Sequence, residues 1–293
     1  MQRADAERLK VSEIMLLAFD IGNTNTVLGV FNEDGKLITN WRIETDPHKS
    51  ADEYGMLVVE LFKHEGLDPK AVDDVIIATV VPSVLFTIRH MAEKYFHKKA
   101  IVVESGIKTG LLIKYDNPKQ VGADRIVNAV AAYNKYGGPL IIIDLGTATT
   151  FCAVSDKAEY LGGTIAPGLK ISSEVLFERT SQLPKVELED PGHTICRNTI
   201  QGMQSGLVYG QMGSVEFIVR KMKKELEEVC PGKPVRVVAT GGLSSLVASG
   251  VDCIDTIDRR LTLEGLQMIY HKNRHHIRHK DTSKSYDEAQ QKL

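Results

Sequence analysis

Two short segments of the chain gather the residue types that bind phosphate. Residues 20–26 read Asp-Ile-Gly-Asn-Thr-Asn-Thr, and residues 144–150 read Asp-Leu-Gly-Thr-Ala-Thr-Thr. In each segment a glycine lets the backbone approach an anion closely, and the surrounding hydroxyl, amide and backbone N–H groups are donors. The leading aspartate can orient a cation, and Asp20 would hold Mg²⁺ mostly through water. Across a cleft from each other, the segments could hold a nucleotide polyphosphate; the alternative is that they only form tight hairpins.

A third segment carries a candidate acid–base residue. Residues 121–126 read Val-Gly-Ala-Asp-Arg-Ile and open an alanine-rich helical stretch. Asp124 would lie near the helix N-terminus, where the dipole favours the carboxylate form. Such a carboxylate can accept a proton from a substrate hydroxyl, as phosphotransferases require, and Arg125 could bind an anionic substrate group. From spacing alone, the alternative is that Asp124 caps the helix while Arg125 is a solvated charge.

The elements that must position these segments follow from the apolar runs and the turn residues. In the first half, three strands are joined by turns too short for a parallel crossover, so they are expected to pair antiparallel. The predicted strands are 15–22, 25–32, 36–45, 72–83 and 100–104, and the predicted helices are about 50–65 and 84–97.

The second half repeats this order of strands followed by helices. Its predicted strands lie within 139–155, 159–170 and 234–242, and its predicted helices are about 122–138, 168–180, 195–209, 212–229 and 262–273. The double glycine at 241–242 suits the close approach of a flat group, or a plain strand–helix turn.

An internal repeat links the two halves. Residues 20–31 align without gaps on residues 144–155 at an offset of 124, which places Asp20 on Asp144 and Thr26 on Thr150. This pattern predicts a duplicated α/β domain with a cleft between the copies. We expect a polar N-terminal extension at 1–14, a first domain at 15–121, a second domain at 122–275 and a polar tail at 276–293.

Composition narrows the class of protein. The chain has 293 residues, enough for two domains, and a formal net charge of −2, which does not favour nucleic acid or an anionic membrane as a partner. No secretory signal or membrane-spanning run is visible, and the four cysteines form no CxxC pair. These features predict a cytoplasmic protein with reduced thiols. Cys152 is expected to be a small buried strand residue without reactivity.

The motifs Asp-x-Gly-Asn-Thr, Gly-Ala-Asp-Arg and Asp-x-Gly-Thr-Ala-Thr, in this order and spacing, resemble those of type III pantothenate kinases. That family belongs to the acetate/sugar kinase, Hsp70 and actin superfamily, and the resemblance runs from about Met15 to about Tyr270. It implies two ribonuclease-H-like (actin-like ATPase) domains with a nucleotide cleft between them, and a homodimer.

The resemblance also implies an activity: ATP-dependent phosphorylation of pantothenate to 4'-phosphopantothenate, the first step towards coenzyme A. Asp124 matches the catalytic base, and Asp144 matches the ligand of a monovalent cation, K⁺ or NH₄⁺; Mg²⁺ accompanies ATP. The implied ATP contacts are Asp20, Ile21, Gly22, Asn23, Thr24, Asn25, Thr26, Val27 and Thr147. The implied pantothenate contacts are Tyr115, Gly122, Ala123, Asp124, Arg125 and Thr199, the last supplied across the dimer interface.

Two other classes of function stay open at this point. One is a nucleotide-binding relative that regulates transcription without catalysis, although such a protein has no need to keep Asp20, Asp124 and Asp144 together. The other is a sugar or carboxylic acid kinase of the same superfamily. Without the resemblance, the residues define only a phosphotransferase or ATPase with an aspartate base.

Overall fold

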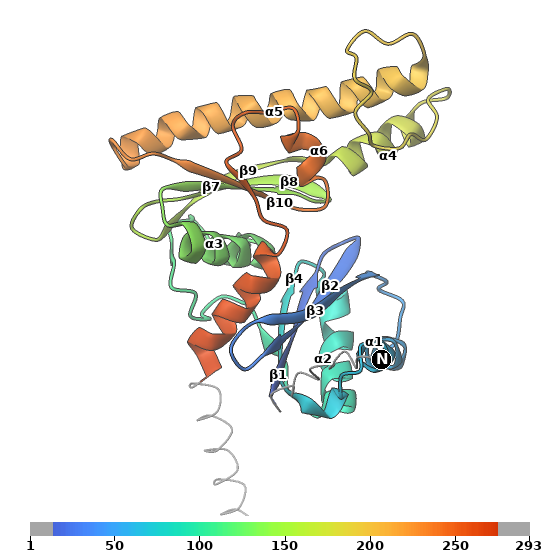
Figure 1. Cartoon of the computed structure of the whole chain (residues 1–293), viewed down its shortest axis with the longest axis vertical. Helices are drawn as coiled ribbons and strands as arrows, with labels where there is room; N and C mark the ends of the chain where they lie inside the picture. Colours follow the sequence, from blue (N-terminus) through green and yellow to red (C-terminus); the bar gives the residue numbers. More distant parts are fainter. Residues whose placement is uncertain (1–13, 275–293) are drawn as a thin grey trace, which may run out of the picture. The chain divides into compact units, whose positions relative to one another are not determined.

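A computed structural model describes residues 14–274, and the predicted extension and tail at 1–13 and from 275 onward lie outside this range. The chain divides after Val103 into two compact units (Figure 1). The expected boundary lay after residue 121. The difference arises because residues 112–113 form a short strand that pairs with residues 159–160, so this connecting segment belongs to the second unit.

The first unit is built on one five-stranded sheet. Its strand order is β3-β2-β1-β4-β5, with β2 antiparallel to both β1 and β3, and with β4 parallel to β1 and β5. The strands are β1 (Met15–Ile21), β2 (Asn25–Asn32), β3 (Leu37–Glu44), β4 (Val72–Thr79) and β5 (Ile101–Val102). The antiparallel start and the later parallel strands agree with the sequence prediction.

Two helices of the first unit, α1 (Ala51–His64) and α2 (Pro82–Phe96), pack on the β1–β4 face through one apolar cluster. Ser50 and Glu53 form a reciprocal capping box that begins α1. α2 begins at Pro82, earlier than the predicted residue 84, because proline is well suited to the first turn of a helix and cannot continue a central strand. A 3₁₀ turn, η1 (Pro69–Ala71), precedes β4.

The second unit repeats this sheet with additions. Its order is β11-β10-β7-β8-β9-β6, so β9-β8-β7-β10-β11 matches β3-β2-β1-β4-β5 position by position and direction by direction. The strands are β6 (Leu112–Ile113), β7 (Leu140–Leu145), β8 (Ala148–Val154), β9 (Glu159–Pro167), β10 (Arg236–Thr240) and β11 (Thr256–Ile257). This shared topology confirms the predicted α/β duplication.

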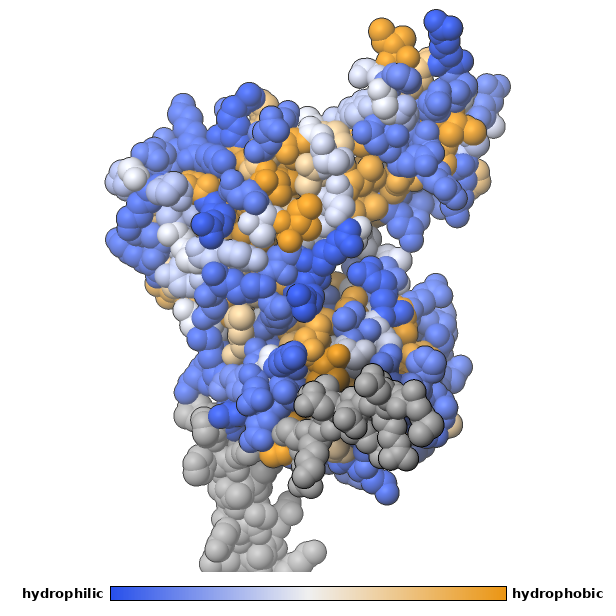
Figure 2. Space-filling model, viewed as in Figure 1, coloured by the Kyte–Doolittle hydropathy of each residue, from blue (hydrophilic) through white to orange (hydrophobic). Residues whose placement is uncertain are grey.

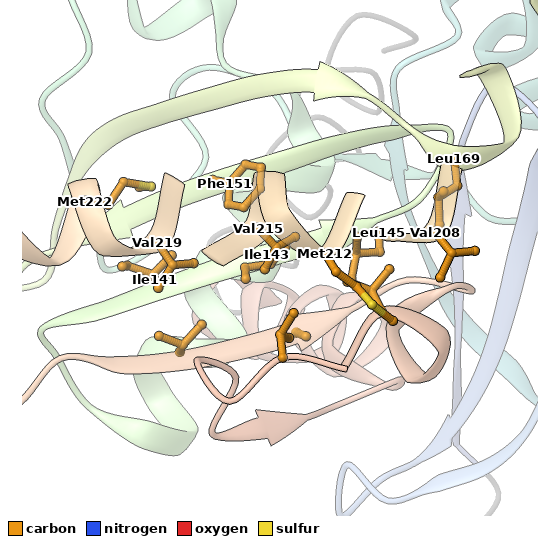
Figure 3. Packing of buried hydrophobic residues seen from close by; sticks show 14 of the residues in the cluster. Ile141, Ile143, Leu145, Phe151, Leu169, Val208, Met212, Val215, Val219 and Met222 are labelled. Atoms are coloured by element: carbon orange, nitrogen blue, oxygen red, sulfur yellow. The ribbon is translucent and has the colours of Figure 1, made fainter. Parts of the chain in front are cut away.

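Helices cover both faces of the second sheet (Figure 1). They are α3 (Ala123–Tyr136), α4 (Leu169–Arg179), α5 (Thr199–Val229) and α6 (Ser244–Ala248), with a 3₁₀ turn η2 (Pro118–Gln120) and a helical stretch at 261–274. Ile141 and Ile143 of β7 point to α5, whereas Leu140 and Ile142 point to α3. Figure 3 shows the first of these clusters, in which Val215 and Val219 of α5 lie over Ile141 and Ile143.

The long helix α5 corrects the sequence prediction. Residues 195–209 and 212–229 were expected to form two helices, but residues 199–229 form one helix of 31 residues. Glycines at 210 and 213 weaken the local helical tendency by about 1 kcal/mol each. The helix continues through them because its opposite side, including Met212 and Val215, is buried against the sheet.

Candidate active site

Asp20 and Asp144 occupy equivalent positions in the two sheets. Asp20 lies near the end of β1, between Val27 of β2 and Ala78 of β4. Asp144 lies near the end of β7, between Thr150 of β8 and Thr240 of β10. Each is half-buried at the mouth of a hairpin on a central strand. The fold therefore places a carboxylate at the same position in each of the two sheets.

The first hairpin loop leaves its middle residues accessible. The Gly22 amide donates to the Asn25 carbonyl (3.0 Å), while Asn23 is exposed and Thr24 is half-buried. Thr26 is fully buried, and its hydroxyl bonds that of Thr45 at 2.8 Å. The predicted ATP contacts thus divide into accessible loop residues, the buried strand residue Ile21, and a buried threonine that joins β2 to the residue after β3.

The second hairpin is one residue shorter than the first. The last cross-strand pair is Ile21–Thr26 in the first hairpin and Leu145–Thr149 in the second, so the loops are residues 22–25 and 146–148. Thr149 is buried like Thr26, whereas Thr150 is half-buried like Val27. The gapless alignment of Thr26 with Thr150 is therefore wrong beyond the loop, because three loop residues in one copy replace four in the other.

The Asp144 carboxylate has one oxygen bound and the other beside two glycines. Its Oδ2 accepts a hydrogen bond from Asn128 Nδ2 at 3.0 Å, and Thr262 Oγ1 donates to Asn128 Oδ1 at 2.8 Å. A Cβ at position 241 would lie 2.7 Å from Asp144 Oδ1, and one at position 146 would lie 3.3 Å from it. Gly241 also has a φ of +93°, so a side chain here is disfavoured by both space and backbone conformation.

Two carboxylates of the second unit influence each other. Burial raises the pKa of Asp144 to about 6, the negative charge of Asp124 adds to this rise, and the Asn128 amide opposes it. Burial also raises the pKa of Asp124, although the Arg125 amide and guanidinium counteract it. The Arg125 amide donates to Asp124 Oδ1 at 2.8 Å. Asp124 is thus an ionisable carboxyl group near Asp144, with a pKa raised in the direction that strengthens a base.

Arg125 is a buried cation with an unsatisfied donor. Its side chain is only 5% exposed. Its Nε donates to the Cys152 sulfur at 3.3 Å, and its guanidinium lies 5.9 Å from the centre of the Tyr160 ring. Its Nη2 is buried without a hydrogen-bond partner in the described part of the chain. A buried cation with a spare N–H suits an anionic group, since a carboxylate would supply both the acceptor and the opposite charge.

The pairing of β6 with β9 places Tyr115 at this cluster. The Lys114 amide donates to the Tyr160 carbonyl at 2.8 Å, and the rings of Tyr115 and Tyr160 are 6.4 Å apart. Gly162 lies beside Tyr115, and its φ of +125° is a backbone conformation that favours glycine. The predicted substrate contacts Tyr115, Gly122, Ala123, Asp124 and Arg125 therefore lie in one unit, around the start of α3.

Thr199 lies elsewhere in the second unit. It is the first residue of α5, is exposed, and follows Asn198, whose side chain accepts from the Gln201 amide. α5 covers the face of the sheet opposite to α3 (Figure 1). Within one chain, Thr199 is consequently separated by the sheet from Asp124. Thr147, by contrast, lies in the second hairpin loop, half-buried beside Gly146.

Four residues of the site were not predicted from the sequence: Asn128, Thr262, Cys152 and Tyr160. Asn128 had an available signal, because it follows Asp124 by four positions on the same helix and is the polar residue of a buried face. Thr262 and Tyr160 come from distant elements, so their contacts depend on tertiary structure. Cys152 was expected to be a plain buried residue, and the structure gives its sulfur two donors.

Asp144 offers one carboxylate oxygen with which a cation could be held. Among residues 14–274, no three His, Cys, Asp or Glu side chains converge as metal ligands. Asp144 Oδ1 is a hard oxygen beside glycine backbone, a type of ligand that suits cations held by oxygens. The helices described in the structure are also too short or too polar to span a bilayer.

Solved structures share this architecture over nearly the whole chain. A Campylobacter jejuni protein assigned to the Baf family of transcriptional activators has 19% identity and a TM-score of 0.54, covering 88% of this chain and 99% of its own. The activator of 2-hydroxyisocaproyl-CoA dehydratase from Clostridium difficile has 11% identity and a TM-score of 0.51, covering 91% and 97%. A Sinorhizobium meliloti protein assigned as a 2-dehydro-3-deoxygalactonokinase has 12% identity and a TM-score of 0.51, covering 88% and 96%. The fold is that of the actin-like ATPases, as predicted.

The sequence then specifies the family within this class. The sequence profile described as type III pantothenate kinase matches residues 16–221, a span that contains both hairpin loops, the start of α3 and the start of α5. The chain belongs to the type III pantothenate kinase family. Its enzymes phosphorylate pantothenate with ATP, as the sequence motifs predicted.

Proposed function

We propose that this chain catalyses the family reaction, transfer of the γ-phosphoryl group of ATP to the primary hydroxyl of pantothenate, with Asp124 as the base. The observation that supports this most directly is the carboxylate of Asp124 at the start of α3, with a raised pKa and with the buried Arg125 beside it. In the reaction, Asp124 takes the proton of the substrate hydroxyl as its oxygen bonds to the γ-phosphorus. The bond to the β–γ bridging oxygen breaks, and ADP leaves.

Arg125 is proposed to bind the carboxylate of pantothenate. Its buried Nη2 provides the donor, and the substrate provides the acceptor and the counter-charge. Tyr115 lines the same cluster through its contact with Tyr160. Gly122 and Ala123 place the backbone of the helix start against the substrate, where the first-turn N–H groups have no helical partner. These contacts would fix the hydroxyl end of pantothenate near Asp124.

The two hairpin loops are proposed to bind the phosphates of ATP. In the first loop Asp20, Gly22, Asn23, Thr24 and Asn25 supply the contacts, and the backbone of Ile21 and Val27 holds its ends. Thr26 supports the loop through Thr45. In the second loop, Thr147 supplies a contact to the phosphates. The similar-fold dehydratase activator was solved with bound ADPNP, an ATP analogue, which supports nucleotide binding by this architecture.

Asp144 is proposed to hold K⁺ or NH₄⁺, and Asp20 is proposed to orient Mg²⁺ through water. Asn128 occupies Asp144 Oδ2, which leaves Oδ1 for the monovalent cation. When bound, the cations neutralise charge on the phosphates. Asn128 and Thr262 keep the Asp144 carboxylate in one orientation, so the site does not need to reorganise when the cation arrives.

A homodimer is proposed to complete the substrate site, with α5 as the contact. Residues 199, 202, 206, 210, 213 and 217 repeat at helical spacing on the side of α5 that faces solvent. Four of them are glycines, and a Cβ added at any of these four meets no atom within 4 Å. Thr199 begins this stripe and Phe217, which is 52% exposed, ends it. Figure 2 shows further apolar surface around α4 and the start of α5, where Val175, Phe177, Ile195 and Ile200 are exposed.

We also propose a cytoplasmic location. The cysteines at 152, 196, 230 and 253 are all free in the described structure, which agrees with a reducing compartment.

The deciding experiment measures ATP consumption with and without pantothenate, in K⁺ and in Na⁺ buffer, beside an Asp124→Asn variant. We expect pantothenate-dependent turnover that needs K⁺ and falls at least a hundredfold in the variant, since general-base catalysis contributes about 10²–10⁴-fold. Wild-type protein that binds ATP but gives no pantothenate-dependent turnover in K⁺ would contradict the proposal.

A further inference from the structure

Cys152 is a buried thiol that the reaction described above leaves without a role. It lies on β8 between Ile142 of β7 and Gly163 of β9, with its side chain on the α3 face of the sheet. Its sulfur accepts two hydrogen bonds, one from Arg125 Nε at 3.3 Å and one from the Tyr160 hydroxyl at 3.3 Å. Burial raises the pKa of Cys152, so the group is a neutral thiol near pH 7.

These contacts restrict how the Arg125 guanidinium can turn. Nε is fixed on the sulfur, and the plane of the group is constrained by the Tyr160 ring, whose centre is 5.9 Å away. The guanidinium is a rigid fork, so fixing one N–H fixes the direction of the others. Within residues 14–274, Nη2 finds no hydrogen-bond partner. The sulfur, together with Tyr115, which also interacts with the guanidinium, therefore fixes where the spare donor of Arg125 is held.

The chemistry of sulfur suits this purpose. A carboxylate in the place of Cys152 would add a second negative charge near Arg125, beyond that of Asp124, and would compete with an acidic substrate for the same donors. An aliphatic side chain would leave Nε buried and unsatisfied, which is costly for a charged group. A thiol is a weak, neutral acceptor, so it satisfies Nε without adding negative charge beside Arg125.

We propose that Cys152 is a positioning residue that holds Arg125 ready for the carboxylate of pantothenate, and so sets the preference for an acidic acceptor over a neutral one. This inference rests on the proposed role of Arg125 in substrate binding. It adds a residue that does not touch substrate, and it makes Tyr160 the second donor that keeps the sulfur in place.

A matched pair of variants tests this. Cys152→Ala and Cys152→Ser remove nearly the same volume, but only serine keeps an acceptor for Arg125 Nε. Each variant and the wild type are assayed with pantothenate and with its neutral alcohol analogue, in which CH₂OH replaces the carboxylate. In Cys152→Ala we expect KM for pantothenate to rise about tenfold with kcat within about twofold, because one hydrogen bond to a charged group is lost. In Cys152→Ser the rise should be about threefold or less.

The neutral analogue separates positioning from general damage to the fold. Its kcat/KM should be the same in wild type and Cys152→Ala, since it has no carboxylate for Arg125 to bind. Equal effects of alanine and serine, or equal losses on both substrates, would overturn the inference. An Arg125→Met variant, assayed in parallel, separates a failure of the Cys152 inference from a failure of the proposed role of Arg125. If this variant leaves KM for pantothenate unchanged, the proposed role of Arg125 fails as well.

Discussion

The carboxyl group of Asp144 connects catalysis with folding stability. Its folded pKa of about 6 exceeds the ordinary value of 3.8, so between these values the native state binds more protons than the unfolded state. The stability that protonation gives is complete below pH 3.8 and is lost as the pH rises through 6. A shift of about two units corresponds to about 3 kcal/mol, which is an upper limit.

Asp144→Asn should therefore stabilise the protein at neutral pH. Asparagine removes the buried charge and keeps an acceptor for Asn128, so we expect the free energy of unfolding at pH 7.5 to rise by about 1–3 kcal/mol. At pH 4 most of this gain should disappear. Urea unfolding in Na⁺ buffer without K⁺ measures both values, with the exposed Asp252→Asn as control. A variant that is less stable than wild type at pH 7.5 would contradict the assignment.

Thr262 provides a second test at the scale of single residues. Thr262→Val removes the hydroxyl that fixes the Asn128 amide, while Thr262→Ser keeps it. Losing one neutral hydrogen bond costs about 1 kcal/mol, so the valine variant should need about fivefold more K⁺ for half-maximal activity. Its kcat at saturating K⁺ should stay within about twofold of wild type. A K⁺ titration of initial rates decides this, and equal effects of valine and serine would refute it.

At the scale of elements, α5 combines a buried side with a solvent side rich in glycine. The sequence suggested a break because glycine disfavours helix, but local preference is weaker than the burial of residues such as Val208 and Val219. The exposed glycines lower the stability of the helix in a single chain. They have a use if a second helix must approach the backbone closely, as in the proposed dimer.

Gly206→Trp tests this face of α5. The position has open space in one chain, so the substitution should preserve helicity, which circular dichroism measures. If two copies meet here, the variant should become monomeric by light scattering. It should also lose at least tenfold in activity, because Thr199 of the partner subunit no longer completes the site.

The control for this substitution is Glu225→Trp, which places the same side chain on an exposed part of α5 outside the stripe. It should stay dimeric and active. A Gly206→Trp protein that remains a fully active dimer would exclude this surface as the interface.

At the scale of the whole molecule, the sequence was sufficient for the fold and for part of the site. The repeated strand pattern predicted both sheets, because apolar alternation and short turns are local signals. The boundary between the units was misplaced because β6 has only two residues and pairs with a strand 47 positions later. Thr262 and the hydrogen bonds of Cys152 were missed for the same reason, since their importance comes from partners that only the tertiary structure brings to them.

The duplication makes a prediction about ligand binding. If both hairpins bind nucleotide, an ATP analogue should slow amide hydrogen exchange in residues 22–25 of the first unit and 146–148 of the second. Pantothenate alone should protect only the second unit, around residues 113–115 and the start of α3. Exchange measured by mass spectrometry with each ligand separately checks this. Protection of a single hairpin by the analogue would show that only one of the two hairpins binds nucleotide.

The pairing of β6 with β9 also has a consequence for synthesis on the ribosome. Every strand of the first sheet lies before residue 104, so that unit can fold while the remainder of the chain is still being made. Tyr115 leaves the ribosome soon afterwards, but it must wait for Tyr160, and Asn128 must wait for Thr262. The unit that carries the proposed substrate site is thus assembled late. A chain that stops short of residue 262 would carry all three of the motifs quoted above and still lack the last contact that orders the proposed cation site.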